Sequence, residues 1–421
     1  MQYWKKLGSK EIRQRIESAL NTNINYEETA CLGIPASILD KQLFESALPA
    51  VQEDPLLRVY LHNPNHIGCH TFGDSEAFFE GTQALERELI ELLATDLLKG
   101  EKNSTDGYVA AGGTEANLQA VWVYRNYYLE NFSCTHDEIV LVSSADTHYS
   151  IHKAANLLHL DAITVPVDAQ NRKIQETALS ELIDDTVAKG KKYFIVIANM
   201  GTTMFGSVDD PAMYASELKK RKLPFFIHVD GAFGGFVYPM STPASNCFLN
   251  NPDISSITLD AHKMLQAPYG TGIFLVRKGL IQNVLTKKAS YISGFDLTVN
   301  GSRSGANAVA VWLLLFSYGP FGWLEKINKL LYRTEWLCNE LHQMGVRYFN
   351  EPGMNIVTID ASFVPAALAH RYGLVPDDHE KPNWYKVVVM DHVNLDSLNV
   401  FLSELAASRK VEGRLEHAIA G

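Results

Sequence analysis

The sequence predicts an α/β protein whose sheet is mostly parallel and is covered by helices on both faces. From about residue 107, short β-branched runs alternate with helical stretches, an order that favours parallel strands joined by crossover helices. Two of these runs, FIVIA and FFIHV, are continuously apolar, as expected for strands that are buried on both faces. Strands return after a long helical region near the end of the chain and indicate a second, smaller α+β domain.

Length, composition and charge limit the classes of function. A chain of 421 residues is too long for one small core and leaves room for two domains. Hydrophobic residues make up 46% and charged residues 20%, as in soluble globular proteins, and the most apolar stretch (308–316) is too short to span a bilayer. The net charge of −11 argues against nucleic-acid and anionic-membrane partners. Five scattered cysteines without metal-ligand spacing predict reduced thiols, no metal site and a cytoplasmic location.

The N-terminal part of the chain is predicted to be helical. Residues 1–20 lack the apolar centre of a signal peptide and are typical of an amphipathic helix, and apolar residues recur at helical spacing over 78–98. We therefore expect an N-terminal helical segment over 1–75, a large domain over 76–305 and a small C-terminal domain over 306–421.

The large domain is predicted to alternate strands and helices. Strands are expected at 108–111, 138–144, 193–200, 225–230, 254–260 and 271–277, the last two as neighbours in the sheet. Helices are expected at 115–129, 149–159 and 210–222. In the C-terminal domain, we expect a long helical region broken at Gly319, Pro320 and Gly322, then strands at 356–360 and 385–391 and a helix at 394–407.

Chemically useful residues follow five of the predicted strands. Open parallel sheets bind their ligands beyond the carboxyl ends of the strands. The segments at these ends are rich in small, hydroxyl-bearing or ionisable residues, and they are AAGGTEAN (110–117), SSADTHYS (143–150), NMGTTMFGSVDD (199–210), HVDGAFGG (228–235) and LDAHK (259–263). One such segment would mean little, but five in succession predict a single site.

GGTEAN is a candidate phosphate-binding turn. Its glycines allow close approach of the backbone, Thr114 offers a hydroxyl, and the helix that follows directs free N–H groups toward an anion. An ordinary turn with Thr114 as the helix N-cap is the alternative. The segment is neither a Walker loop nor GxGxxG, so nucleotide binding is not indicated.

Asp230 and Lys263 each follow a run that is predicted to be buried. A carboxylate there needs a cationic partner or several hydrogen bonds, and a protonated ring nitrogen would serve; a turn-capping aspartate is the alternative. A desolvated lysine is a nucleophilic amine, whereas a lysine that extends its ammonium to water is the alternative. An anion-binding turn, a carboxylate for a ring nitrogen and a desolvated lysine are together what pyridoxal 5′-phosphate (PLP) requires.

With these motifs the sequence resembles the group II PLP-dependent amino-acid decarboxylases, the family of the aromatic-amino-acid, histidine, glutamate and archaeal tyrosine/aspartate decarboxylases. GGTEAN, DTHYS, GTT followed by Asp, HVDGAFGG, the HK pair and NGSRSG (300–305) occur in family order within residues 75–320. The resemblance implies fold type I, the aspartate-aminotransferase-like fold, with a mostly parallel seven-stranded sheet. It also implies a homodimer with the active site at the subunit interface, and loss of the α-carboxylate of an L-amino acid to give an amine and CO2.

The resemblance also assigns roles to individual residues. Lys263 would bind PLP covalently, Asp230 would pair with its ring nitrogen, and Ala232 would lie beneath the ring. His148 would stack on the other face of the ring, and Tyr291 would return a proton to the substrate carbon. The remaining cofactor-binding residues that it implies are Gly113, Thr114 and His262 at the phosphate, Thr203 near the ring hydroxyl, Asp209 in support, and Gly301 and Ser302, which resemble a segment that reaches the phosphate from the neighbouring subunit.

Two other classes of function remain open at this point. A carbon–carbon lyase or an aminotransferase of the same fold would use the same cofactor, and Arg371 is an arginine that an aminotransferase could use to bind the substrate carboxylate. A PLP-fold protein that only binds a ligand should have lost some of the catalytic residues. Lys263, Asp230, His148 and Tyr291 are all present, which disfavours that class.

The substrate is not predicted by the sequence. Tyr291 is typical of simple decarboxylation, although a packed strand tyrosine is the alternative for this residue. His66, His70 and Phe72 lie in a region that helps to form the substrate pocket in the family, so they are candidates for substrate contact or for capping of loop backbone. An aromatic or imidazole side chain and an acidic one are both possible.

Overall fold

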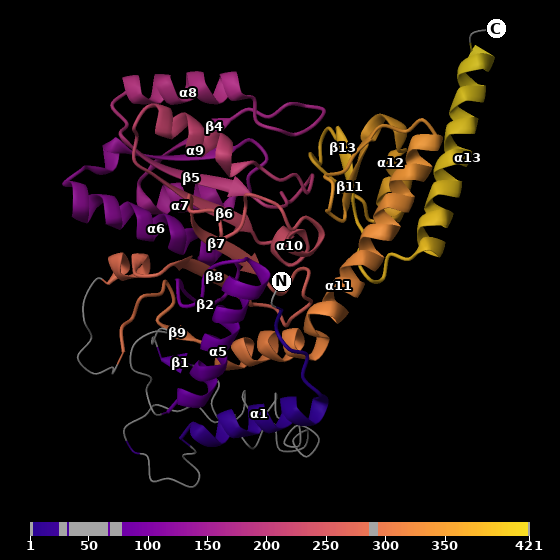
Figure 1. The fold of residues 1–421 in the computed structure, drawn as a ribbon. Helices are drawn as coiled ribbons and strands as arrows, with labels where there is room; N and C mark the ends of the chain where they lie inside the picture. The colour runs from indigo at the N-terminus through magenta and orange to yellow at the C-terminus, as the bar shows by residue number, and fades with distance from the viewer. Residues whose placement is uncertain (1–2, 25–31, 33–65, 68–77, 286–293, 420–421) are drawn as a thin grey trace.

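The computed structural model describes residues 3–24, 32, 66–67, 78–285 and 294–419 (Figure 1). Its described strands form a seven-stranded sheet, a four-stranded sheet and a two-stranded pairing of β1 (His66–Ile67) with β9 (Ser302–Arg303). Helices flank the large sheet, and the smaller sheet lies to one side of it (Figure 1). The predicted α/β architecture with a mostly parallel sheet is confirmed.

The seven-stranded sheet has the order β2-β8-β7-β6-β5-β3-β4. Its strands are β2 (Thr105–Ala110), β3 (Ile139–Ser144), β4 (Asp161–Val165), β5 (Tyr193–Asn199), β6 (Phe225–Gly231), β7 (Ile254–Asp260) and β8 (Gly272–Arg277). Only β8 runs against its neighbours β2 and β7, so the other strands all point the same way. Their carboxyl ends therefore meet at one edge of the sheet.

Helices cover both faces of this sheet because alternate residues of each strand point to opposite sides. Val140 and Val142 of β3 belong to one core, whereas Ile139 and Leu141 belong to the other. The first core includes residues of α1 (Ser9–Thr22), α5 (Glu80–Leu92), α8 (Glu176–Ala188) and α9 (Pro211–Lys220). The second includes residues of α6 (Gly113–Phe132) and α7 (Ser150–Leu158). The helix predicted over 78–98 is α5, continued by the π-helical turn η2 (Leu93–Leu97).

The long helix α11 (Gly305–Gln343) joins the two sheets and bends where the sequence predicts. Gly319 has φ of +64° and Pro320 follows it, but Gly322 lies within the regular helix. Among the described helices, α11 is the one with the length and hydropathy to cross a membrane, yet 56% of its apolar window is buried inside the protein. Its first half packs on α5 and α1, as expected of a core helix.

The smaller sheet has the order β10-β11-β13-β12, and all of its pairs are antiparallel. Its elements are β10 (Tyr348–Phe349), β11 (Ile356–Asp360), β12 (Val375–Pro376) and β13 (Trp384–Val388), with α12 (Ala366–Arg371) and α13 (Leu395–Ile419). A separate core joins this sheet to α13 and to the end of α11, from which Leu337 and Leu341 contribute. Because α11 contributes to both cores, the boundary at residue 305 stays a prediction, as does the one at residue 75.

Candidate active site

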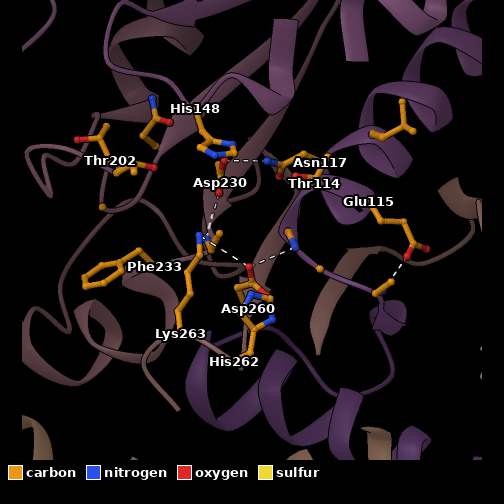
Figure 2. Close-up of a pocket in the computed structure, with 18 of the residues that line it drawn as sticks. Thr114, Glu115, Asn117, His148, Thr202, Asp230, Phe233, Asp260, His262 and Lys263 are labelled. Carbon is orange, nitrogen blue, oxygen red and sulfur yellow. Dashed lines mark hydrogen bonds and ion pairs between the residues drawn. The ribbon is translucent and has the colours of Figure 1, made fainter. Parts of the chain in front are cut away.

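A cavity of about 530 Å³ opens at the carboxyl ends of the large sheet (Figure 2). All five segments that follow the predicted strands contribute to its wall. The lining residues of these segments are Ala111–Glu115 and Asn117, His148, Asn199 and Gly201–Thr203, Asp230, Ala232 and Phe233, and Asp260, His262 and Lys263. The structure therefore brings together polar and ionisable side chains that are more than a hundred residues apart in the sequence.

Asp230 lies at the end of β6 with its carboxylate buried at the cavity floor. Its Oδ1 accepts a hydrogen bond from the backbone N–H of Ala232 at 3.0 Å, and its Oδ2 accepts one from Asn117 Nδ2 at 2.8 Å. The buried carboxylate thus has two hydrogen bonds, as expected for this position. The bond from Ala232 also caps the turn after β6, which was the alternative role for Asp230. These bonds orient the Asp230 carboxylate in the cavity, where it can accept a hydrogen bond from a protonated ring nitrogen.

Lys263 lies in the turn after β7 and not in a buried strand, because β7 ends at Asp260. Its side chain is 34% exposed, and its Nζ lies 3.7 Å from Asp260 Oδ2. Of the two alternatives for Lys263, this exposure favours a lysine whose ammonium reaches solvent over one that is desolvated by the core. The side chain instead lines the open cavity, where its amine is accessible to an incoming aldehyde (Figure 2).

Asp260 is a candidate site residue that the sequence analysis did not single out, although it stands in the LDAHK segment. Its Oδ2 accepts a hydrogen bond from the backbone N–H of Gly113 at 3.3 Å and faces Lys263, and its Oδ1 lies 3.0 Å from His262 Nδ1. Burial raises the pKa of Asp260 to about 6. This carboxylate therefore links the glycine turn, the histidine and the lysine at one point of the cavity.

The glycine turn leads directly into α6, whose N-terminus faces the cavity. Gly112 is the N-cap residue, and no side chain caps the helix, so the alternative of Thr114 as the N-cap is wrong. A Cβ atom added to Gly113 would lie 3.1 Å from Asp260 Oδ2 and 3.2 Å from Ala232 Cβ, which is tighter than ordinary contact. The uncapped first turn of a helix offers N–H groups to an anion, as a phosphate site requires.

His148 follows β3 and lines the cavity with a half-buried ring. Its Nδ1 lies 2.9 Å from Ser150 Oγ, and the backbone N–H of Ser150 donates to the same nitrogen at 3.3 Å. Burial lowers the pKa of His148, against a smaller opposing effect of Asp230. Burial therefore favours the neutral form of the His148 ring.

The GTT segment brings two threonines to the cavity, and Asp209 lies behind it. Thr202 and Thr203 line the wall, but Asp209 does not. Asp209 Oδ2 instead accepts hydrogen bonds from the backbone N–H and the side-chain Nδ2 of Asn199 at 2.8 and 2.7 Å, and Asn199 lines the cavity. Within this chain, Asp209 thus reaches the cavity wall through Asn199, as expected of a supporting residue, and its part in cofactor binding stays a prediction.

The remaining predicted residues fall into three groups. Ala232 and His262 line the cavity, and the ring of His262 stacks on Tyr269 with centroids 4.4 Å apart. Gly301 and Ser302 do not line it in this chain; Val299 and Asn300 do, and the role of Gly301 and Ser302 toward a neighbouring subunit stays a prediction. Tyr291, His70 and Phe72 lie outside the described residues, and of His66 only the backbone pairing with Arg303 is described.

These residues fit PLP. The helix N-terminus at Gly113 and Thr114 suits its phosphate, Asp230 its ring nitrogen and Lys263 its aldehyde. The cavity has the volume of a typical small-molecule site. When bound, PLP supplies an electron sink for the electron pair that is released when a bond to the α-carbon of an amino acid breaks.

Comparisons with known proteins agree with this arrangement. Residues 80–358 match the family model described as the pyridoxal-dependent decarboxylase conserved domain. The chain is 52% identical over 411 residues to a tryptophan decarboxylase of Clostridium sporogenes, covering 97% of this chain and 99% of that protein. It is 31% identical over 340 residues to a probable L-tyrosine/L-aspartate decarboxylase of Methanosphaera stadtmanae, covering 78% of this chain and 83% of that protein.

Solved structures show the same fold. An L-methionine decarboxylase of Streptomyces sp. 590 superposes with a TM-score of 0.69 at 21% identity, covering 94% of this chain and 92% of that one. A sphingosine-1-phosphate lyase of Burkholderia pseudomallei superposes with a TM-score of 0.68 at 16% identity, covering 99% of this chain and 88% of that one. Because one fold serves both activities, this likeness establishes fold type I and leaves the reaction to the sequence relatives.

Proposed function

Because the chain belongs to the pyridoxal-dependent decarboxylase family, we propose that it removes the α-carboxylate of an aromatic L-amino acid, with tryptophan as the preferred substrate. That the protein is a PLP-dependent amino-acid decarboxylase follows from the family match and from its relatives. The observation that carries the choice of substrate is the 52% identity to a tryptophan decarboxylase over 97% of this chain, against 31% over 78% for a probable tyrosine/aspartate decarboxylase.

Each of the predicted site residues has a separate role in this reaction. Lys263 holds the cofactor through its amine, and the N-terminus of α6 with Gly113 and Thr114 holds the phosphate. Asp230, held by Asn117, would keep a proton on the ring nitrogen and so favour the negative charge that the cofactor would accept when CO2 is lost. His148, which lines the cavity, would lie against the bound ring and could contact the substrate carboxylate, and Tyr291 would supply the proton to the α-carbon.

The described wall of the cavity supports an aromatic side chain better than an acidic one. Leu118, Phe233, Tyr269 and Val299 give it apolar surface. A second carboxylate on the substrate would need a cation to offset its desolvation. No arginine lines the cavity among the described residues, and Lys263 is their one lysine there, which is reserved for the cofactor.

The aminotransferase alternative loses its candidate arginine. Arg371 Nη1 pairs with Glu404 Oε2 at 2.6 Å, its side chain is 65% exposed, and it does not line the cavity. An aminotransferase would need such a cation beside the substrate carboxylate. We therefore do not favour transamination as the main activity.

We also propose that the enzyme is a cytoplasmic homodimer with its cavity at the subunit interface. Two tyrosines support the dimer, since Tyr269 at the cavity is 89% exposed and Tyr149 beside His148 is 64% exposed in the single chain. The free thiols of Cys134, Cys247 and Cys338 support a reducing location.

A substrate panel tests the proposed function. The purified enzyme, loaded with PLP, is incubated with tryptophan, tyrosine, phenylalanine, histidine, aspartate and glutamate, and kcat/KM is measured from CO2 and amine. We expect equal amounts of CO2 and amine, with tryptophan giving the highest kcat/KM. A higher kcat/KM for aspartate would overturn the aromatic substrate while leaving the decarboxylase in place. Keto acid as the main product from every amino acid would contradict decarboxylation itself.

A further inference from the structure

A buried hydrogen-bond chain joins Asp230, which we place at the ring nitrogen of the cofactor, to His148, which we place on one face of the ring. Its members come from different elements and are all at most 1% exposed; they are Asn117 and Tyr124 of α6, Ser150 of α7, His228 of β6 and Ser256 of β7. Buried polar groups of this kind are held in one arrangement because leaving any of them unpaired is costly.

Asn117 stands at the centre of this chain, and Figure 2 shows its hydrogen bond to Asp230. Its Nδ2 lies 2.8 Å from Asp230 Oδ2 and 3.0 Å from Ser150 Oγ, and its Oδ1 lies 3.0 Å from His228 Nε2. Because a carboxylate only accepts hydrogen bonds, the NH2 group of Asn117 faces Asp230 and its oxygen faces His228. The two N–H bonds of one amide thus serve both Asp230 and Ser150.

The hydroxyl of Ser150 connects Asn117 to His148. Its hydroxyl oxygen accepts from Asn117, so the hydroxyl hydrogen is available for His148 Nδ1 at 2.9 Å. The backbone N–H of Ser150, which can only donate, points at the same Nδ1 at 3.3 Å. With two donors directed at Nδ1, the neutral ring carries its hydrogen on Nε2.

The other branch of the chain is consistent with this direction. The oxygen of Asn117 only accepts, so His228 carries its hydrogen on Nε2, and its Nδ1 accepts from Ser256 Oγ at 2.6 Å. Ser256 Oγ in turn accepts from the hydroxyl of Tyr124. His228 Nε2 also lies 3.1 Å from Thr258 Oγ1, so its hydrogen has two acceptors, Thr258 Oγ1 and Asn117 Oδ1. The contacts on both sides of Asn117 nevertheless agree on the orientation of its amide.

We propose that Asn117 is a positioning residue that orders Asp230 and His148 together, and that it holds His148 in the tautomer with hydrogen on Nε2. This inference rests on the proposed roles of Asp230 and His148 and not on the choice of tryptophan. Ser150 contacts Nδ1, so Nε2 is the nitrogen left free. In this tautomer Nε2 carries a hydrogen and acts as a hydrogen-bond donor, not as a base. That arrangement suits a contact with the substrate carboxylate and disfavours removal of the α-proton.

The tautomer is tested by ¹⁵N NMR of the cofactor-free enzyme labelled in its histidine rings, with the His148 signals assigned by their loss in His148→Gln. We expect the wild-type ring to show a protonated Nε2 and an unprotonated Nδ1. In Asn117→Ala the Ser150 hydroxyl is no longer held, and only the longer bond from the Ser150 backbone N–H still favours an unprotonated Nδ1, so we expect part of the ring population to shift to the tautomer with hydrogen on Nδ1. Asn126→Ala is the matched control. Asn126 lies on the same helix as Asn117, and its amide donates to the Asn283 carbonyl outside the cavity. A wild-type ring with hydrogen on Nδ1, or identical spectra for wild type and Asn117→Ala, overturns the inference.

Ser150→Ala distinguishes the bond from Asn117 to Asp230 from the bond from Asn117 to Ser150. It also keeps the inference testable if Asn117→Ala fails to fold. It removes the hydroxyl on the His148 side and leaves the bond from Asn117 to Asp230 intact. We expect Ser150→Ala to keep the PLP affinity of the wild type and Asn117→Ala to lose affinity, while kcat falls in both, about tenfold to hundredfold as for other residues that orient ligands. Equal PLP affinity in the two variants would contradict the shared role of the amide. A wild-type enzyme without any decarboxylation would instead refute the proposed function, because the NMR result does not depend on turnover.

Discussion

At the scale of single residues, Asp209 shows how burial alone makes a carboxylate sensitive to pH. Desolvation raises the pKa of Asp209 to about 6 from an ordinary value of 3.8, although Asn199 donates to it twice. The folded state therefore binds this proton more tightly than the unfolded state. Its contribution to the free energy of unfolding is full below about pH 4 and is lost as the pH rises through about 6.

We therefore predict that Asp209→Asn gains stability relative to wild type as the pH rises. Asparagine stays neutral, so the variant should gain about 3 kcal/mol over wild type between pH 4 and pH 7, the equivalent of the raised pKa. Equilibrium urea unfolding of both proteins at each pH measures the difference. The exposed Asp185→Asn on α8 serves as the control. A difference between Asp209→Asn and wild type that is the same at both pH values would contradict a raised pKa.

Lys263 is predicted to be the residue that binds PLP covalently. Reduction of the PLP-loaded enzyme with borohydride should fix the cofactor on the peptide that contains Lys263, and Lys263→Ala should lose both this label and at least a thousandfold in kcat. Lys386→Ala is the control, because the Lys386 amine lies near the cavity but donates to the Thr203 carbonyl at 2.9 Å. Peptide mass spectrometry identifies the site, and a label on another lysine would show that Lys263 has been misassigned.

Single residues were predictable from the sequence where a motif names them and not where only the fold gives them a role. Asp230, His148 and Lys263 stand in such motifs, and all three line the cavity. Asn117 and Asp260 stand in the same segments, but nothing in the sequence shows that the amide of Asn117 on α6 reaches Asp230 on β6 or that the Asp260 carboxylate faces Gly113. These contacts join residues more than a hundred positions apart, so they exist only once the strands are assembled.

At the scale of elements, the sequence predicted strands from apolar runs and therefore found those that are buried on both faces. It missed β4, because all but one of the residues of this edge strand are exposed or half-exposed, and the two-residue strands β10 and β12. It placed 254–260 and 271–277 side by side, as they are in β7 and β8. That β8 runs antiparallel to β7 was not predicted, because burial on both faces removes the pattern without indicating direction.

The bend in α11 gives a prediction with an internal control. A Cβ atom on Gly319 would lie 2.4 Å from Lys6 Cβ, and its φ of +64° disfavours any other residue, whereas a Cβ atom on Gly322 would meet nothing within 4 Å. We expect Gly319→Ala to lower the free energy of unfolding by at least 1 kcal/mol. Gly322→Ala should raise it by about 0.5–1 kcal/mol, because alanine is the better helix former. Urea unfolding measures both, and the same sign for the two variants would show that the bend does not depend on Gly319.

At the scale of the whole molecule, the active-site cavity lies beside the junction of the two domains. A second cavity of about 580 Å³ lies between loops of the large domain and the smaller sheet, and Thr203 lines both cavities. Lys386 of β13 donates to the Thr203 carbonyl, and Phe205 packs edge to face on Trp384 with ring centroids 5.9 Å apart. The smaller sheet therefore contacts the GTT segment directly, which the sequence could not show because Lys386 and Thr203 lie about 180 residues apart.

The proposed homodimer gives the last prediction, which concerns the surface around the cavity. Tyr269 lines the cavity and is 89% exposed in the single chain, so a second copy that covers it would bury a large aromatic side chain. We expect wild type to sediment at about twice 46.9 kDa, and Tyr269→Asp, which would bury an unpaired charge, to shift toward the monomer and lose activity in parallel. Tyr332→Asp is the control, since Tyr332 is 60% exposed on α11 but does not line the cavity. A wild-type mass of one chain would refute the dimer, whereas an unchanged dimer in Tyr269→Asp would place the interface away from this tyrosine.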